Sequence, residues 1–292
     1  MSTIVSEPSP LARSEKRAAR SERLRLLARS PLVIGGAIVI AFWIFCALFP
    51  GLVTPYNPIF DNNFVPSQPP SWAHPFGTDT NGRDIFSRVL AGSRAILQIS
   101  IAATVIATVL GTSLGLVTGY LRGVVDDVMS RFVDAILSLP LIITAIFIVT
   151  AVGNSGRSVV TLIIGLIFTP VISRTVRAGV LAEAELDYVQ AARLRGERRQ
   201  YIMFSEILPN VMSLVVVEFT VRLGYAIFAI ATLGFLGFGV APPSPDWAAQ
   251  IYQYYTLIDP YWWMTLFPAL AIASLVVAVN LVADGIREAY ER

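Results

Sequence analysis

Few side chains in this 292-residue sequence could carry covalent or metal chemistry. It contains one cysteine, Cys46, and one histidine, His74, and these two residues cannot form a zinc site of cysteine and histidine ligands. Its one lysine, Lys16, does not follow a glycine-rich loop, so the GxxxxGK(S/T) motif that holds ATP phosphates is absent. We therefore expect no metal or cofactor on this chain, and we expect any ATP-hydrolysing site to belong to another subunit.

Residues 153–156 read Gly-Asn-Ser-Gly, which matches the GxSG motif of intramembrane serine proteases. In such an enzyme a histidine base inside the membrane activates the serine. His74 instead lies in a polar segment between two apolar ones, so this motif lacks its base. The sequence therefore does not indicate an enzyme.

Glu218 and Arg222 are charged residues inside an apolar segment. On a helix this spacing places them one turn apart on one face, with the acid first, which is the favourable order. Either charge alone in lipid would cost about 2.5–3.5 kcal/mol. The pair should therefore face the protein interior or a watery cavity, either as an internal ion pair or as part of a transport pathway.

The composition indicates what kind of protein must position these groups. Hydrophobic residues make up 55% of the chain, charged residues make up 14%, and the mean hydropathy is +0.65. Such a chain is too apolar for a soluble domain and is typical of an all-α, multi-pass membrane protein. We expect six transmembrane helices, at residues 31–53, 95–121, 132–152, 159–173, 210–238 and 264–283.

Two of these spans carry features that predict their packing. Small residues that recur at every fourth position of the second span predict close contact with a neighbouring helix. They are Ala103, Ala107, Gly111, Gly115 and Gly119. In the third span, Pro140 predicts a kink, because proline interrupts the helical hydrogen bonds.

Positive charge is distributed unevenly between the segments that join the spans. The tail at residues 1–30, the connections at 121–131 and 174–207, and the C-terminus carry about seven, two, six and two Lys and Arg residues. The other connections carry three, one and none. Because cytoplasmic segments carry the excess of Lys and Arg, both termini are expected in the cytoplasm.

The segment that precedes the second span has turn and capping residues. Residues 74–94 read HPFGTDTNGRDIFSRVLAGSR. Asp79 to Gly82 has the composition of a turn, and Asp84 can cap a short amphipathic helix that carries Ile85, Phe86, Val89 and Leu90.

The longest polar connection reads YVQAARLRGERRQYIMFSEILPN over residues 188–210. We expect two short helices here, the first over residues 183–195 and ended by Gly196, the second from residue 197 to about 207. Pro209 suits the first turn of the next span. Ala191 and Ala192 would leave one face of the first helix flat, so that a partner surface could approach its backbone closely.

Three stretches of the chain resemble permease subunits of bacterial ABC importers. Residues 74–94 carry the GTD…GRD…SR…G.R pattern of the dipeptide, oligopeptide and nickel branch, residues 191–209 carry the AA…G…IxP pattern of its coupling loop, and residues 235–247 carry FLG…PP.P.W. The resemblance covers roughly residues 30–290 and is strongest to the C-type permease of peptide transporters. It implies a type I permease core whose coupling loop, residues 183–209, docks on an ATPase.

The resemblance also implies roles for individual residues. The ATPase-coupling residues would be Gln190, Ala191, Ala192, Gly196, Ile207 and Pro209. The residues that shape the outer mouth would be Gly77, Thr78, Asp79, Gly82, Arg83, Asp84 and Trp247. Glu218 and Arg222 would be pathway-lining candidates.

The domain division that follows is a cytoplasmic tail (1–30), a first transmembrane helix with its outer segment (31–94), and the permease transmembrane domain (95–288). The implied partners are a second homologous permease, two ABC ATPase subunits that carry ATP and Mg, an extracytoplasmic solute-binding protein and membrane lipid, with no nucleic acid. The implied location is the bacterial cytoplasmic (inner) membrane. The cargo would be di- or oligopeptides, with nickel or glutathione as alternatives; an ion-coupled secondary transporter or a channel is a more distant alternative.

Overall fold

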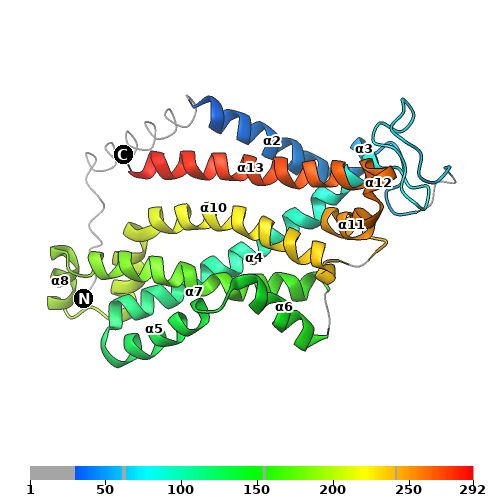
Figure 1. The fold of residues 1–292 in the computed structure, drawn as a ribbon. Helices are drawn as coiled ribbons and strands as arrows, with labels where there is room; N and C mark the ends of the chain where they lie inside the picture. The colour runs from blue at the N-terminus through cyan, green and yellow to red at the C-terminus, as the bar shows by residue number, and fades with distance from the viewer. Residues whose placement is uncertain (1–29, 61–63, 154–155, 241, 292) are drawn as a thin grey trace.

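The computed structural model describes residues 30–60, 64–153, 156–240 and 242–291, and the expected N-terminal tail lies outside these ranges except for Ser30. The regular structure of the described ranges is helical, apart from one isolated β-bridge between Thr78 and Asp84. Long helices run roughly side by side (Figure 1). The helices are α2 (Pro31–Leu48), α3 (Pro50–Val53), α4 (Ile85–Leu121), α5 (Gly123–Leu137), α6 (Leu141–Val152), α7 (Arg157–Glu183), α8 (Asp187–Leu194), α9 (Arg199–Tyr201), the π-helix η1 (Ile202–Ile207), α10 (Leu208–Leu233), the π-helix η2 (Gly234–Phe238), α11 (Trp247–Tyr254), the 3-10 helix η3 (Tyr255–Leu257), α12 (Ile258–Tyr261) and α13 (Trp263–Glu291).

The helices confirm the expected class of multi-pass membrane protein. Five of those described are long and apolar enough to cross a membrane, namely α2, α4, α7, the run of helix over residues 199–238, and α13. The third expected span, at 132–152, is not one kinked helix. It is the pair α5 and α6, bent by 90° at a break whose last residue, Pro140, has extended backbone angles (φ −61°, ψ 123°) and so cannot continue α5.

Helix α4 corrects a second expectation, because the short helix at Asp84 and the span at residue 95 are one helix of 37 residues. Asp84 does cap it, since its carboxylate accepts the backbone N–H of Ser87 at 2.8 Å. Gly92 does not break the helix. It gives room for Trp247, whose ring would lie 2.5 Å from a Cβ at that position.

The stripe of small residues on α4 packs against α7, as expected. Ala103 and Ala107 are fully buried, and a Cβ added to Gly111 or Gly115 would lie 2.7 Å from atoms of α7. Helices α4 and α7 can therefore approach closely along their length. On the other side of the bundle, α2 packs on α13, where the indole N–H of Trp43 donates to Ser274 at 3.0 Å.

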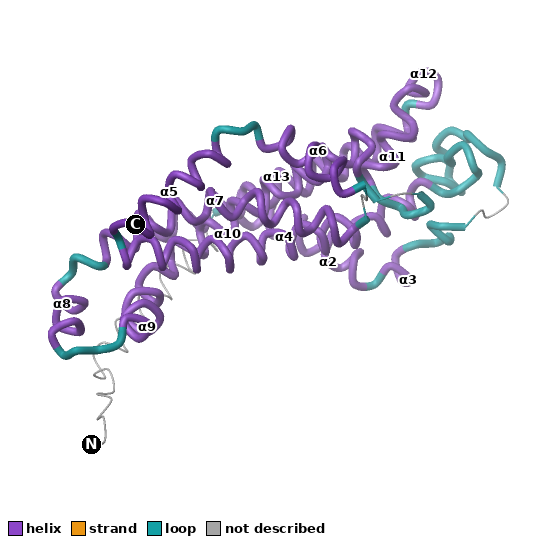
Figure 2. The backbone as a smooth tube through the Cα atoms, turned by 90° about the horizontal axis from the view of Figure 1, so that it is seen from below, coloured by secondary structure: helices purple, strands orange, loops and turns teal. Residues whose placement is uncertain are grey.

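The molecule has two distinct ends, and both views separate them (Figures 1 and 2). Helix α8 lies at one end, hereafter the α8 end. The loop of residues 54–84, together with α11 and α12, lies at the other, hereafter the 54–84 end. Helix α13 finishes toward the α8 end, and α2 begins on that side (Figure 1).

Candidate functional site

Gly196 ends α8 as the sequence predicts. Its φ of +74° is left-handed, and the N–H groups of Gly196 and Glu197 donate to the carbonyls of Arg193 and Ala192 at 3.0 and 3.2 Å. These two bonds form a Schellman motif, which satisfies the last carbonyls of the helix. The start of the helix differs from the expected residue 183, because α7 continues to Glu183 and α8 begins only at Asp187.

The second expected helix of this connection is not a separate element. One run of helix continues from Arg199 through η1 and α10 into η2, where Gly237 (φ +88°) departs from helical geometry. Pro209 lies in the first turn of α10, and the N–H of Leu208 before it donates to Met203, five residues back. Because proline lacks an N–H and its ring crowds the preceding turn, the wider π-helical turn accommodates Pro209 without breaking the helix.

The expectation that Ala191 and Ala192 form a flat face open to a partner is wrong for Ala192. Ala192 is 0% exposed and packs with Val189 and Ile207 in the hydrophobic core of this chain, so it cannot face a partner. Ala191 and Gln190 are half-buried, whereas Gly196 and Pro209 are exposed. The helix turns its small residues toward its own protein.

The exposed face of α8 carries a leucine surrounded by arginines. Leu194 is 90% exposed, and Leu186, at the N-cap, is exposed as well. Arginines 193, 195, 198 and 199 of the same connection are all exposed. The sequence reasoning missed Leu194, although its position two residues after the buried Ala192 places it on the opposite side of the helix.

Tyr188 ties this connection to two long helices and was also missed. Its hydroxyl donates to Glu183 at the end of α7 (2.8 Å) and accepts from the side-chain amide of Asn210 in α10 (3.0 Å). Burial and the bond to Glu183 raise the pKa of Tyr188 to about 12, so the hydroxyl keeps its proton at physiological pH. A displacement of α8 is thereby linked to α7 and α10 together.

Two further contacts link the α8 connection to α4. The guanidinium of Arg193 lies 5.1 Å from the ring centroid of Tyr120, near the end of α4. Arg122, which follows α4, forms an ion pair with Glu185, which precedes α8.

Glu218 and Arg222 lie on α10 and form the expected pair. Arg222 Nε lies 2.9 Å from Glu218 Oε2, and the side chains are 18% and 13% exposed, respectively. Arg222 also lies 5.5 Å from the ring centroid of Tyr225. The pair therefore avoids carrying an uncompensated charge into the membrane, and this geometry suits an internal ion pair as well as a pathway-lining group.

At the 54–84 end, Asp79 is the centre of a buried polar network. Its carboxylate accepts from Arg83 Nε at 2.7 Å and from the Tyr254 hydroxyl at 3.1 Å, and Arg88 Nε lies 3.7 Å away. It also accepts the N–H of Asn81 at 2.8 Å, which closes the turn predicted from the sequence. Burial, with the nearby Asp79 charge, raises the pKa of Tyr254, so its hydroxyl remains a donor.

Three further side-chain contacts stabilise the 54–84 end. His74 Nδ1 lies 2.9 Å from Asp84, and the indole of Trp247 donates to the carbonyl of Val89 at 2.6 Å. The indole of Trp263 reaches the carbonyl of Thr78 at 3.2 Å. Thr78 and Asp79 therefore join the 54–84 loop to α13, α11 and α4, while Trp247 joins α11 to α4.

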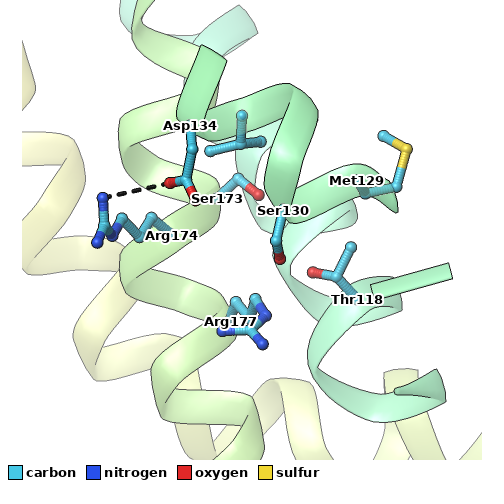
Figure 3. Close-up of a pocket in the computed structure, with 8 residues that line it drawn as sticks. Thr118, Met129, Ser130, Asp134, Ser173, Arg174 and Arg177 are labelled. Atoms are coloured by element: carbon cyan, nitrogen blue, oxygen red, sulfur yellow. Dashed lines mark hydrogen bonds and ion pairs between the residues drawn. The ribbon is translucent and has the colours of Figure 1, made fainter. Parts of the chain in front are cut away.

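A pocket between α4, α5 and α7 was not predicted (Figure 3). Its volume is about 100 Å³, and Thr118, Ser130 and Ser173 line it with hydroxyl groups. Arg177 beside it forms two hydrogen bonds with Asp126, at 2.5 and 2.6 Å, and Arg174 pairs with Asp134 at 3.5 Å (Figure 3). These two ion pairs hold α5, the helix before the 90° bend, against α7.

Within the described ranges, no three His, Cys, Asp or Glu side chains are grouped so that they could hold a metal ion. What the arrangement offers is a helical end with exposed arginines and a leucine, a paired charge within a long helix, and a locked loop at the opposite end.

The chain is similar to known membrane transport proteins. Residues 111–292 match the family model described as binding-protein-dependent transport system inner membrane component. The chain is 34% identical to the di/tripeptide transport system permease protein DppC of Pseudomonas aeruginosa (strain UCBPP-PA14), over 97% of this chain and 92% of that protein. It is 36% identical to the dipeptide transport system permease protein DppC of Escherichia coli (strain K12), over 99% and 96%.

The fold is also similar to that of a solved structure. A chain of the MetNI methionine ABC transporter, in an inward-facing conformation, superposes with a TM-score of 0.57 and 21% sequence identity. The match covers 70% of this chain and 97% of that chain.

Proposed function

This chain belongs to the family of binding-protein-dependent transport system inner membrane components, and we propose that it forms half of the transmembrane pathway through which an ATP-driven importer takes up di- and oligopeptides. It is the permease subunit of a peptide ABC importer. The observation that carries this assignment is the 34–36% identity to dipeptide permeases over nearly the whole chain. Those relatives are named as permease proteins, which are transport components and not enzymes.

Permeases of this family work with ATPase subunits and a permease partner, and the chain is a multi-pass protein of the bacterial inner membrane. In the proposed assembly, two ATPase subunits carry ATP and Mg, and a solute-binding protein delivers the peptide. The α8 end faces the cytoplasm. Its exposed arginines support this orientation, because cytoplasmic segments concentrate positive charge, and α2 begins and α13 finishes toward this end.

The surface that docks on the ATPase is the exposed side of α8, with Leu194 at its centre. A protruding leucine loses its contact with water when a partner covers it, and arginine is enriched in interface cores. Ala192, Ile207 and Val189 support this surface from behind by packing in the core. Gly196 ends the helix and so sets its length and direction.

Movement of the ATPases would reach the pathway through the contacts of the α8 connection. Tyr188 bonds to α7 and α10, while Arg193 and Glu185 contact α4 and the residue that follows it. Glu218 and Arg222 lie on α10, so the same movement would displace this pair. We propose that the pair lines the pathway and meets the charged ends of a peptide.

The experiment that tests the cargo is uptake by the purified complex in proteoliposomes with its binding protein. Labelled alanyl-alanine should accumulate, and an excess of unlabelled di- or tripeptide should compete with it. Competition by Ni²⁺ or glutathione alone, with no peptide uptake, would contradict the peptide assignment and favour a nickel or glutathione permease of the same family.

A further inference from the structure

A cleft at the 54–84 end is lined by two arginines, Arg94 and Arg157. Its volume is about 490 Å³, and it lies between residues 91–98 of α4, the first residue of α7 and the loop that contains Ser244. Arg94 projects into it from α4, and Arg157, the first residue of α7, from the other side. Both arginines are exposed, and so is Gln98, one turn after Arg94.

In the described part of the chain, one acid near the cleft, the buried Asp246, attracts Arg157 electrostatically without forming an ion pair with it. Among the described residues, no carboxylate lies within 4.0 Å of the guanidinium nitrogens of Arg94 or Arg157, whereas Arg83, Arg177 and Arg222 each have such a partner. The nearby Asp246 is buried and caps α11 by accepting the N–H of Ala249 at 2.9 Å. Arg157 donates instead to the neutral Gln98 at 3.2 Å, which orients its guanidinium and leaves other N–H groups free to bind.

Apart from Gln98 and Ser244, the rest of the lining is apolar, with Ile59, Ala95 and Pro245 among its residues. Arginine binds carboxylates through paired, charge-assisted hydrogen bonds, and the apolar wall would accept an uncharged side chain. The volume is also in the range of small-molecule sites, about 300–1,000 Å³.

We propose that this cleft binds the free C-terminal carboxylate of a peptide at the entrance of the pathway, with Arg94 and Arg157 as its ligands. The inference rests on the proposed function, because it needs peptide cargo to arrive at the 54–84 end. It adds a specificity element in the permease itself: a peptide with a free carboxylate is held, and the same peptide with a C-terminal amide is not.

The test places one thiol at the cleft of the full complex in nanodiscs, without the binding protein. Ser244→Cys in a Cys46→Ala chain is labelled with an anionic (sulfonatoethyl) or a neutral methanethiosulfonate, and the modification is followed by mass spectrometry. Arg94→Gln and Arg157→Gln should each slow the anionic reagent roughly threefold and leave the neutral one unchanged, because a unit charge a few ångströms away attracts an anion by this amount in water. Arg131→Gln, an exposed arginine of α5, is the matched control and should change neither rate.

Millimolar alanyl-alanine and its N-acetylated form should protect the thiol, alanyl-alaninamide should not, and both arginine variants should abolish the protection. Equal protection by the amide, absence of protection, or protection only when the binding protein is added would overturn the proposal; the last result would assign the cleft to a protein acid.

Uptake by the same complex separates this inference from the proposed function. Dipeptide uptake without protection of the thiol would contradict only the proposal that the cleft binds the peptide. Failure of dipeptide uptake by an assembled complex that hydrolyses ATP would contradict the assignment of peptides as the cargo.

Discussion

At the scale of the residue, Asp79 shows how a sequence pattern becomes a structural constraint. Two arginines and a tyrosine surround its buried carboxylate, and the arginines alone would be uncompensated charges in the interior. The turn at Asp79 and the cap at Asp84 could be predicted from the sequence, since both depend on neighbours within four residues. The contact with Tyr254 could not, because it joins residues 175 positions apart.

We predict that Asp79→Asn destabilises the permease by about 3–5 kcal/mol, because it leaves Arg83 and Arg88 buried without their counter-charge. The yield of folded, detergent-purified protein and its thermal midpoint should both fall. Asp127→Asn, an exposed acid of α5, is the matched control and should leave both unchanged. An Asp79→Asn protein with the midpoint of the control would show that the network does not stabilise the fold.

Glu218 and Arg222 allow the two roles of a paired charge to be separated. We expect Glu218→Gln and Arg222→Gln to assemble normally and to alter uptake or cargo preference, without rescue by the double variant, because each charge meets the peptide separately. Assembly is measured by co-purification with the ATPases, and uptake in proteoliposomes. Failure of the single variants to assemble, with recovery of assembly and uptake in the double variant, would make the pair structural.

At the scale of the element, two features position α8. One face of the helix is buried through Val189 and Ala192, and Gly196 ends the helix. The end of the helix at Gly196 could be predicted, because glycine followed by polar residues favours a left-handed cap. The inward direction of Ala192 could not, because it depends on packing against Ile207 and Val189 from elsewhere in the connection and on where α7 ends. The bend between α5 and α6 was underestimated, because a proline predicts a break but not its angle, which is 90° here.

Gly196→Val should weaken the coupling of ATP hydrolysis to uptake. A Cβ at this position would contact nothing within 4 Å, so the cost is conformational, of the order of 1–3 kcal/mol for a β-branched residue at φ +74°. Gly196→Asn is the matched control, because asparagine tolerates this conformation. The measurement is the number of peptides taken up per ATP hydrolysed, which should be lower for Gly196→Val than for Gly196→Asn. Equal ratios for these two variants would contradict the prediction.

At the scale of the whole molecule, the multi-pass, apolar character followed from composition, whereas helix boundaries did not. Among the described residues, five helices can cross a membrane, or six if the bent pair α5 and α6 is one span. The 37-residue α4 exceeds what a membrane requires and carries the 54–84 loop beyond it. No local signal separates this helix from two shorter ones, since its only glycine near the expected break serves the contact with Trp247.

Cysteine labelling checks the proposed orientation in a Cys46→Ala chain. Trp72→Cys, in the exposed part of the 54–84 loop, should react with a membrane-impermeant maleimide in intact cells, after the outer membrane of a Gram-negative host is permeabilised. Glu185→Cys, beside α8, should react only after the inner membrane is opened as well. The reverse pattern would place the α8 end outside and remove the proposed ATPase contact.

The central claim is that ATP hydrolysis on a partner drives peptide uptake through this chain by way of α8. The most direct measurement records alanyl-alanine uptake and ATP hydrolysis together in proteoliposomes, for the wild type, Leu194→Asp and the conservative Leu194→Met. We predict ATP-dependent uptake that an ion gradient cannot replace, loss of uptake in Leu194→Asp because a charge replaces the apolar docking side chain, and near-normal uptake in Leu194→Met. Uptake driven by an ion gradient without ATP, or unchanged coupling in Leu194→Asp, would contradict this account.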